Sequence, residues 1–228
     1  MVIMYTYRQR VRAQAMVASL AMVLAAVTMT TGCGSQDGSG TLPAEGPAKR
    51  TAPPQFAEMI LDTPRLERAL PDQFSVPAEV SQSRNRKAWD AGEAAICRSE
   101  EWPAQWCSQA VALGVAAYTN ARDQELSVRL IAFRTPEQAA ELFVGKGTED
   151  EVGKNPPGDQ IDGFEIPPGQ GWQGRGISVR QGAVIATIKY TWRQGTDILS
   201  DRLMSVTKMT VERIKQAQHG ETPTASTR

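Results

Sequence analysis

Few residues of this chain have the types and spacing that catalysis needs. The only histidine, His219, lies in a polar segment near the C-terminus, which removes the usual general base and most zinc sites. No G-x-S-x-G motif accompanies a serine nucleophile. The stretch Gly169–Gly174 matches G-x-G-x-x-G, but it precedes a predicted strand instead of opening a helix, so a dinucleotide site is not expected. We therefore expect a non-catalytic protein without a cofactor.

The main alternative to this interpretation is metal binding or catalysis by acidic side chains in a glycine-rich stretch. They are Glu149, Asp150, Glu151, Asp159, Asp162 and Glu165. Their spacing does not match a calcium-binding loop and Lys154 interrupts the cluster, so we expect a solvated loop and no metal. A cell-envelope hydrolase or an enzyme inhibitor acting through these carboxylates stays open, because catalytic carboxylates pair in space and not in sequence.

The charge balance argues against a nucleic-acid partner. The chain has 25 Lys and Arg against 25 Asp and Glu. The first 32 residues contain Arg8, Arg10 and Arg12 but no acidic residue, which leaves 22 basic against 25 acidic groups in the rest. A slightly acidic protein has no electrostatic attraction for phosphates, so we expect no nucleic-acid binding.

Residues 1–32 have the pattern of a targeting segment. The three arginines precede an apolar run from Ala13 to Val27, and small residues then lead to Gly32-Cys33. This segment resembles the type II signal peptide of bacterial lipoproteins, with Cys33 as the lipidated residue. The resemblance implies a lipid anchor, such as palmitate, on the extracytoplasmic side of the cell membrane, since two acyl chains give stable attachment. Cleavage to a free secreted protein and retention as an uncleaved anchor are the alternatives.

The other two cysteines, Cys97 and Cys107, are then free to pair outside the cytoplasm. A redox-active pair would need a tighter spacing such as C-x-x-C, so we expect a structural disulfide. In the chain-entropy model, closing a loop of about ten residues stabilises the fold by about 2.5–3 kcal/mol.

Composition divides the rest of the chain into a tether, a domain and a tail. Residues 33–55 are rich in Gly, Ser, Pro, Thr and Ala, which bury too little surface to fold, so we expect a flexible tether. Residues 56–219 are long enough for one domain with its own core. Residues 220–228 are polar, and we expect a disordered tail there.

Hydrophobic periodicity predicts two hairpins and several helices in the domain. Apolar residues alternate over 111–117 and 126–132, and again from 177 to 192, where Gly182 can adopt the positive φ of a tight turn. Thr135-Pro136-Glu137-Gln138 is typical of a helix start with a capping box. Further helices are expected at Pro54–Leu70, with Pro64 breaking the run, at Arg86–Cys97 and at Asp201–Gln218.

These elements predict a single α+β domain. The order strand, strand, helix occurs twice around a long loop at 145–176, which suggests a ββα duplication and a four-stranded antiparallel sheet with two helices on one face. A cleft between the other face and this loop is the expected ligand site. Four residues near it have suitable side chains for ligand contacts: Trp172, Arg175, Asp159 and Asp162. Trp102, Trp106 and Trp192 are expected to pack in the core.

From about Met59 onward, three features occur together: the Leu70-Pro71 step, the two cysteines ahead of the first hairpin, and the strand followed by Thr-Pro-Glu-Gln-Ala-Ala at residues 135–140. This pattern resembles extracellular sensor-type lipoproteins of actinobacteria. That group is similar in outline to the extracellular sensor domain of mycobacterial serine/threonine kinases. The resemblance implies a single α+β domain with a groove that binds a small ligand or an envelope protein without catalysis. A purely structural spacer is the third possibility.

Intact mass spectrometry of the protein extracted from membranes tests the lipid anchor. We expect a chain that begins at Cys33 and carries a diacylglyceryl group, because the Cys33 thiol is the attachment point, and we expect the lipid to be lost in Cys33→Ala. An unmodified mass, or an uncleaved N-terminus, would contradict the prediction.

Overall fold

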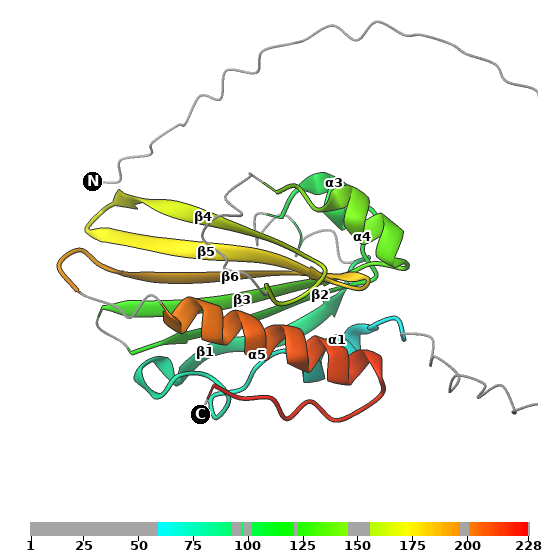
Figure 1. The fold of residues 1–228 in the computed structure, drawn as a ribbon, viewed down its shortest axis with the longest axis horizontal. Coiled ribbons are helices and arrows are strands. Elements are labelled where there is room, and N and C mark those ends of the chain that lie inside the picture. The colour runs from blue at the N-terminus through cyan, green and yellow to red at the C-terminus, as the bar shows by residue number, and fades with distance from the viewer. Residues whose placement is uncertain are drawn as a thin grey trace, which may run out of the picture. The chain divides into compact units, whose positions relative to one another are not determined.

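A single antiparallel sheet forms the centre of the domain, with helices on both of its faces (Figure 1). The computed structural model describes residues 59–92, 97, 102–120, 123–145, 156–196 and 201–227. All of them belong to one compact unit, Ala52–Arg228. The tether at 33–55, the segment 1–32 and Cys33 lie outside the described residues. No helix in the described part of the chain is long and apolar enough to cross a membrane.

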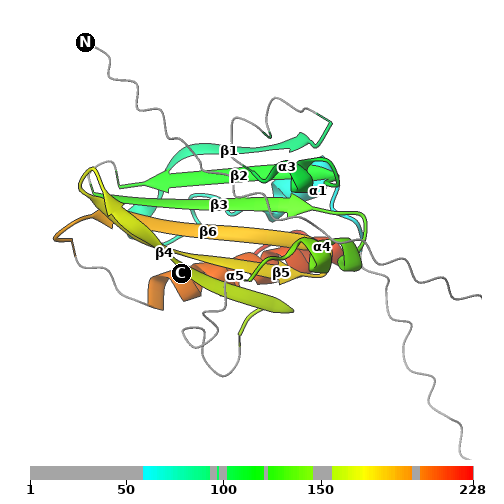
Figure 2. The ribbon, with the colours of Figure 1, turned by 90° about the horizontal axis from the view of Figure 1, so that it is seen from above.

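The sheet has six strands where the sequence predicted four. They are β1 (Gln82–Asp90), β2 (Ala112–Thr119), β3 (Gln124–Ala132), β4 (Gln160–Gly169), β5 (Trp172–Gln181) and β6 (Val184–Arg193). Their spatial order is β1-β2-β3-β6-β5-β4, and each neighbouring pair is antiparallel. Figure 2 shows the strands from above, with β1 at one edge. The two predicted hairpins are confirmed as β2–β3 and β5–β6, and Gly182 has the expected positive φ, +55°.

The two strands that the sequence did not predict are the sheet edges. β1 carries Arg84, Arg86 and Lys87, and we expected a helix over much of it. Such charges suit an edge strand, because they discourage pairing with another chain. β4 lies within the expected loop at 145–176 and ends in Pro167-Pro168-Gly169. Proline is tolerated there because an edge strand leaves some of its N–H groups unpaired.

Two of the four predicted helices are confirmed at their starts, Pro136 and Asp201, whereas the first helix begins later than expected and the helix expected from Arg86 is wrong there because β1 occupies those residues. α4 (Pro136–Leu142) begins after Thr135, whose hydroxyl accepts from the Gln138 N–H at 3.2 Å. α5 spans Asp201–Gln218 as predicted.

α1 is shorter than expected and spans Thr63–Ala69. Asp62 caps its start, and Pro64 lies in its first turn, where proline is tolerated, so Pro64 does not break the helix as predicted. Two further short elements are the 3-10 helix η1 (Ala78–Val80) and α3 (Ala104–Cys107).

The helices cover opposite faces of the sheet, whereas we expected the two longest on one face. α1 and α5 pack on the face that carries Val128 and Ile188, in the larger core cluster. α4 packs through Ala139 on the other face, against Leu113 and Ile131. The expected repeat is also longer than ββα: each half has three strands before its helix, and the strand order is symmetric about the β3–β6 pair. The placement of α4 and α5 breaks that symmetry.

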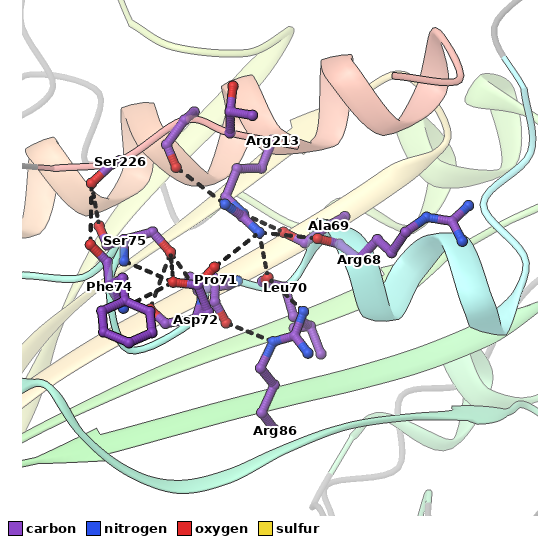
Figure 3. Close-up of polar contacts among 12 residues, drawn as sticks. Arg68, Ala69, Leu70, Pro71, Asp72, Phe74, Ser75, Arg86, Arg213 and Ser226 are labelled. Atoms are coloured by element: carbon purple, nitrogen blue, oxygen red, sulfur yellow. Dashed lines mark hydrogen bonds and ion pairs between the residues drawn. The ribbon is translucent and has the colours of Figure 1, made fainter. Parts of the chain in front are cut away.

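A buried arginine on α5 joins four segments (Figure 3). Arg213 is 3% exposed. Its guanidinium donates to the carbonyls of Ala69 at 3.2 Å and of Arg68 and Leu70 at 3.1 and 3.0 Å, at the C-terminal end of α1. It also donates to the Ala225 carbonyl at 3.2 Å and lies 3.9 Å from the Asp72 carboxylate. Burial lowers the pKa of the Arg213 guanidinium, and Asp72 acts in the opposite direction.

Two further donors complete the end of α1. Arg86 of β1 donates to the Glu67 carbonyl at 2.7 Å and to the Pro71 carbonyl at 3.0 Å. The Tyr118 hydroxyl of β2 also donates to Pro71, at 2.5 Å. Burial raises the pKa of Tyr118 to about 12, so the phenol remains a neutral donor at physiological pH. The helix carbonyls that α1 leaves unpaired are thus satisfied by side chains from the sheet and from α5.

The C-terminal segment is ordered, in contrast to the disordered tail that its composition predicted. The Thr227 N–H donates to the Ser75 carbonyl at 2.9 Å, and the Gln216 side chain accepts from the Thr224 N–H at 2.9 Å. With the Arg213 contact to Ala225, these bonds lay residues 221–227 along the turn at 72–75. Composition could not reveal this, because the partners are backbone groups of distant segments.

Replacing Arg213 by Met should lower the free energy of unfolding by about 3–4 kcal/mol, because four carbonyls, two of them in buried hydrogen bonds, lose a charged donor. Chemical denaturation of the chain from Gly34 onward measures this. The control is Arg68→Met, because the Arg68 side chain is exposed and only its carbonyl takes part in the contact. Equal stabilities of the two variants would contradict the role we assign to Arg213.

Candidate functional site

Cys97 and Cys107 form a disulfide, as the sequence predicted. Their Cα atoms are 5.9 Å apart and Cys107 is the last residue of α3. Cys97 is buried in a second core cluster, with Leu113, Ile131, Phe133, Ala139 and Ile185. Trp102 and Trp106 pack against this cluster, as expected. The disulfide therefore anchors α3 to the end of the sheet that α4 also covers.

A pocket of about 600 Å³ opens beside this disulfide. Its described lining consists of Ala91, Gly92, Cys97, Trp102, Ala104, Cys107, Ser108 and Ala110. The volume lies within the range of about 300–1,000 Å³ that is typical of small-molecule sites. Small side chains leave the space open, and the Trp102 ring and the disulfide supply polarisable apolar surface.

The chemistry of this lining suits an apolar, uncharged ligand. None of the lining residues that the structure describes is charged. The only side-chain hydroxyl among them is that of Ser108, which donates to the Gln105 carbonyl at 3.1 Å. A ligand would therefore gain mainly from burial of apolar surface, at about 25 cal/mol per Å².

The four ligand-contact residues predicted from sequence do not share one site. Asp159 lies beside the β5–β6 turn, where its carboxylate pairs with Arg180 at 2.9 Å and accepts from the Gly182 N–H at 2.7 Å. Trp172 begins β5 at the other end of the β4–β5 hairpin, and Arg193 stacks on its ring at 5.5 Å. Nine residues of strand, about 26 Å, separate the two ends.

Arg175 and Asp162 lie on opposite faces of the same hairpin. Arg175 is two positions from Ile177, which packs in the core cluster with α5. Alternation along the strand therefore places Arg175 on the face that α5 covers. Its guanidinium is 3.8 Å from the Glu165 carboxylate. Asp162 is 2% exposed and pairs in register with Ser178, on the face that carries Ile185.

The acidic stretch does not form a metal site within the described residues, where no three His, Cys, Asp or Glu side chains converge. Glu149, Asp150 and Glu151 lie outside the described residues. Of the remaining three acids, Asp159 is held by the turn, whereas Asp162 and Glu165 point to opposite faces of β4.

A second, smaller pocket of about 200 Å³ lies at the free end of the β4–β5 hairpin. β4 contributes Glu165, Ile166 and Pro168, β5 contributes Gln173, Gly174 and Arg175, and β6 contributes Trp192. Only Arg175 among these was predicted as a ligand contact. The others were missed because β4 was assigned to a loop, and without β4 the pocket has no wall.

Sequence reasoning also missed most of the disulfide pocket. Alanine, glycine and serine carry no signal of binding, since the cavity comes from the space that they leave. The tryptophans around the two cysteines were the only available signal, and we assigned them to packing.

No protein-family model matches the chain, and no curated protein matches it. The two pockets must therefore be interpreted from their own geometry.

Removing the disulfide should destabilise the domain by about 2–4 kcal/mol, because the unfolded chain regains the entropy of an open loop. The measurement is urea denaturation of the chain from Gly34 onward with Cys97→Ala and Cys107→Ala combined. Mass spectrometry without reductant should find the two cysteines linked in the unaltered protein. Two free thiols, or unchanged stability, would contradict a structural disulfide.

Proposed function

We propose that the protein is a lipoprotein, anchored to the extracytoplasmic side of the cell membrane through Cys33, that binds a small apolar ligand without catalysis. The observation that carries the binding role is the pocket of about 600 Å³ beside the Cys97–Cys107 disulfide. Its size suits a small molecule, and its small apolar side chains suit an uncharged one.

The position of the pocket supports a sensor-like role. Its lining comes from the residues that follow β1 (Ala91, Gly92), from α3 and from Ala110, which lies just before β2. The disulfide and Trp102 connect this lining to the cluster on which α4 also packs. A ligand that fills the pocket would therefore contact three segments at once. If it binds one conformation of α3 more tightly than another, it shifts α3 toward that conformation.

The geometry favours binding over the alternative of an envelope hydrolase or an inhibitor acting through acidic loop residues. Paired catalytic carboxylates need separations of about 5–10 Å across one site. Asp159 is engaged by Arg180 and the Gly182 N–H, and Asp162 and Glu165 face opposite ways. If the alternative held, amide replacement of these three acids would abolish an activity, whereas apolar ligand binding would be unaffected.

Binding of the neutral fluorescent probe N-phenyl-1-naphthylamine tests the pocket. We expect saturable fluorescence enhancement with the chain from Gly34 onward, which retains the entire compact unit. Ala104→Phe should weaken probe binding by roughly tenfold or more, because the ring occupies space that the ligand needs.

The matched control is Gln105→Phe, which adds the same ring to the same helix at an exposed residue that does not line the pocket. Probe binding to this variant should be unchanged. Absence of saturation would show that the probe has no specific site. Equal loss in both variants would show that it binds elsewhere. Either result would overturn the proposed site.

A further inference from the structure

The two sulfurs of the Cys97–Cys107 disulfide differ in their access to solvent. Cys97 is 4% exposed and belongs to the second core cluster, whereas Cys107 is half-buried at the end of α3. Both residues line the pocket of about 600 Å³, so the bond forms part of the wall of an open space. A thiolate that enters this pocket can therefore reach the Cys107 sulfur, while apolar side chains of the second cluster pack around Cys97.

Small side chains surround the Cys107 side of the bond. Ala104 precedes Cys107 by about one helical turn, Ser108 follows it directly, and both line the pocket. None of the lining residues that the structure describes carries a negative charge, which would repel a thiolate. An incoming sulfur therefore meets neither bulk nor like charge from the described part of the lining.

The disulfide holds in place a helix that has little other support. α3 has only four residues, and within the described chain no side chain caps its N-terminus. Trp106 packs on the second cluster at a cost, because its indole N–H is buried without a hydrogen-bond partner in the part of the chain that the structure describes. A helix this short is not stable by itself, so cleavage of the disulfide should release α3 from the sheet.

Release of α3 would leave the rest of the domain folded. The larger core cluster, formed by the sheet with α1 and α5, is built from other residues. Figure 1 shows α3 near one end of the sheet, as α4 is. The change would therefore be a local opening, in which the pocket loses the wall that Ala104, Cys107 and Ser108 supply.

We propose that Cys107 is a site of modification by small uncharged thiols, and that the disulfide is a redox switch for the pocket. A thiolate attacks the Cys107 sulfur and forms a mixed disulfide there, and Cys97 leaves as a thiolate that takes a proton from water. A second thiolate attacks the sulfur bound to Cys107, which releases Cys107 as a thiol and forms a small disulfide. Two thiols are thus oxidised to one disulfide, while the cysteine pair gains two electrons and two protons.

The effect on the ligand rests on the proposed function, whereas the chemistry at Cys107 does not. A ligand that fills the pocket would cover the Cys107 sulfur, and cleavage would remove part of the wall that holds the ligand. By linkage, the ligand then protects the bond, and reduction weakens ligand binding. The ten-residue separation of Cys97 and Cys107 argues against a redox catalyst, but it does not shield the bond from a thiol.

Reaction with 2-mercaptoethanol tests the site of attack. The chain from Gly34 onward, which retains the entire compact unit, is treated with this thiol without denaturant, quenched with acid and mapped by mass spectrometry. We expect the early mixed disulfide on Cys107 and a free thiol on Cys97, because the Cys107 sulfur is the more accessible one. Mixed disulfide on Cys97, equal modification of both cysteines, or no cleavage without denaturant would overturn the proposal.

Three variants test the route through the pocket. Ala104→Phe should slow cleavage by roughly tenfold or more, because the ring fills the space that the thiol enters. Gln105→Phe adds the same ring at an exposed residue of α3 outside the described lining, and it should leave the rate unchanged. Arg213→Met lowers stability and would speed a reaction that requires unfolding, whereas attack on the folded domain should keep its rate. Faster cleavage in Arg213→Met, or equal slowing by both phenylalanine variants, would contradict the route.

The probe N-phenyl-1-naphthylamine tests the linkage with the ligand. Saturating probe should slow cleavage of the unaltered protein by roughly fivefold or more. Reduction and alkylation of both cysteines should abolish saturable probe binding but retain the far-ultraviolet circular dichroism of the sheet.

These measurements separate the switch from the proposed function. If the oxidised protein does not bind the probe, the proposed function fails together with the linkage, and the mass map alone decides the modification of Cys107. If the probe binds but neither slows cleavage nor is lost on reduction, the switch is overturned while the proposed function stands. Loss of the circular dichroism on reduction would contradict a local release of α3.

Discussion

The buried guanidinium of Arg213 is the interaction on which the arrangement of the domain depends. Taking this charge out of water is costly, and the cost is offset only because carbonyls from α1 and from the C-terminal segment converge on it, with Asp72 nearby. Arg86 and Tyr118 satisfy the remaining carbonyls at the same helix end. The seating of α1 on the sheet, the path of residues 71–75 and the order of residues 221–227 all follow from this one cluster (Figure 3).

With one face of the sheet closed by α1 and α5, the sites of interest lie at its two ends. The disulfide and α4 cover one end of the opposite face, where small residues around Trp102 leave an apolar pocket. The β4–β5 hairpin extends at the other end, beyond the start of α5, where Trp192 meets polar side chains. A rigid centre with functional groups at its margins is a common arrangement, because strand ends and loops can vary without loss of the core.

How much of this the sequence predicted depends on where each residue lies in the sheet. The central strands β2, β3, β5 and β6 have one or both faces buried, so their apolar residues alternate or run together, and both hairpins were predicted. The edge strands β1 and β4 bury little, and their charges, glycines and prolines resemble those of loops. Missing β4 had a direct consequence. Arg175 was identified without Glu165 as its partner, and Trp172 was grouped with Arg175, which lies on the opposite face, and with Asp159, which lies at the other end of the hairpin.

The sequence by itself determined the local features: the capped start of α4, the bounds of α5, the turn at Gly182, and a cysteine pair with a spacing suited to a structural disulfide. Each of these depends on neighbouring residues or on short-range geometry. The tertiary structure alone decided that the sheet has six strands, that α4 and α5 lie on opposite faces, that Arg213 caps α1, and that two pockets exist. These depend on contacts between segments more than a hundred residues apart in places, such as Arg213 and Ala69, and on cavities left by small side chains. Long-range contacts and cavities leave no periodic pattern in the sequence, because folding alone determines which residues become neighbours.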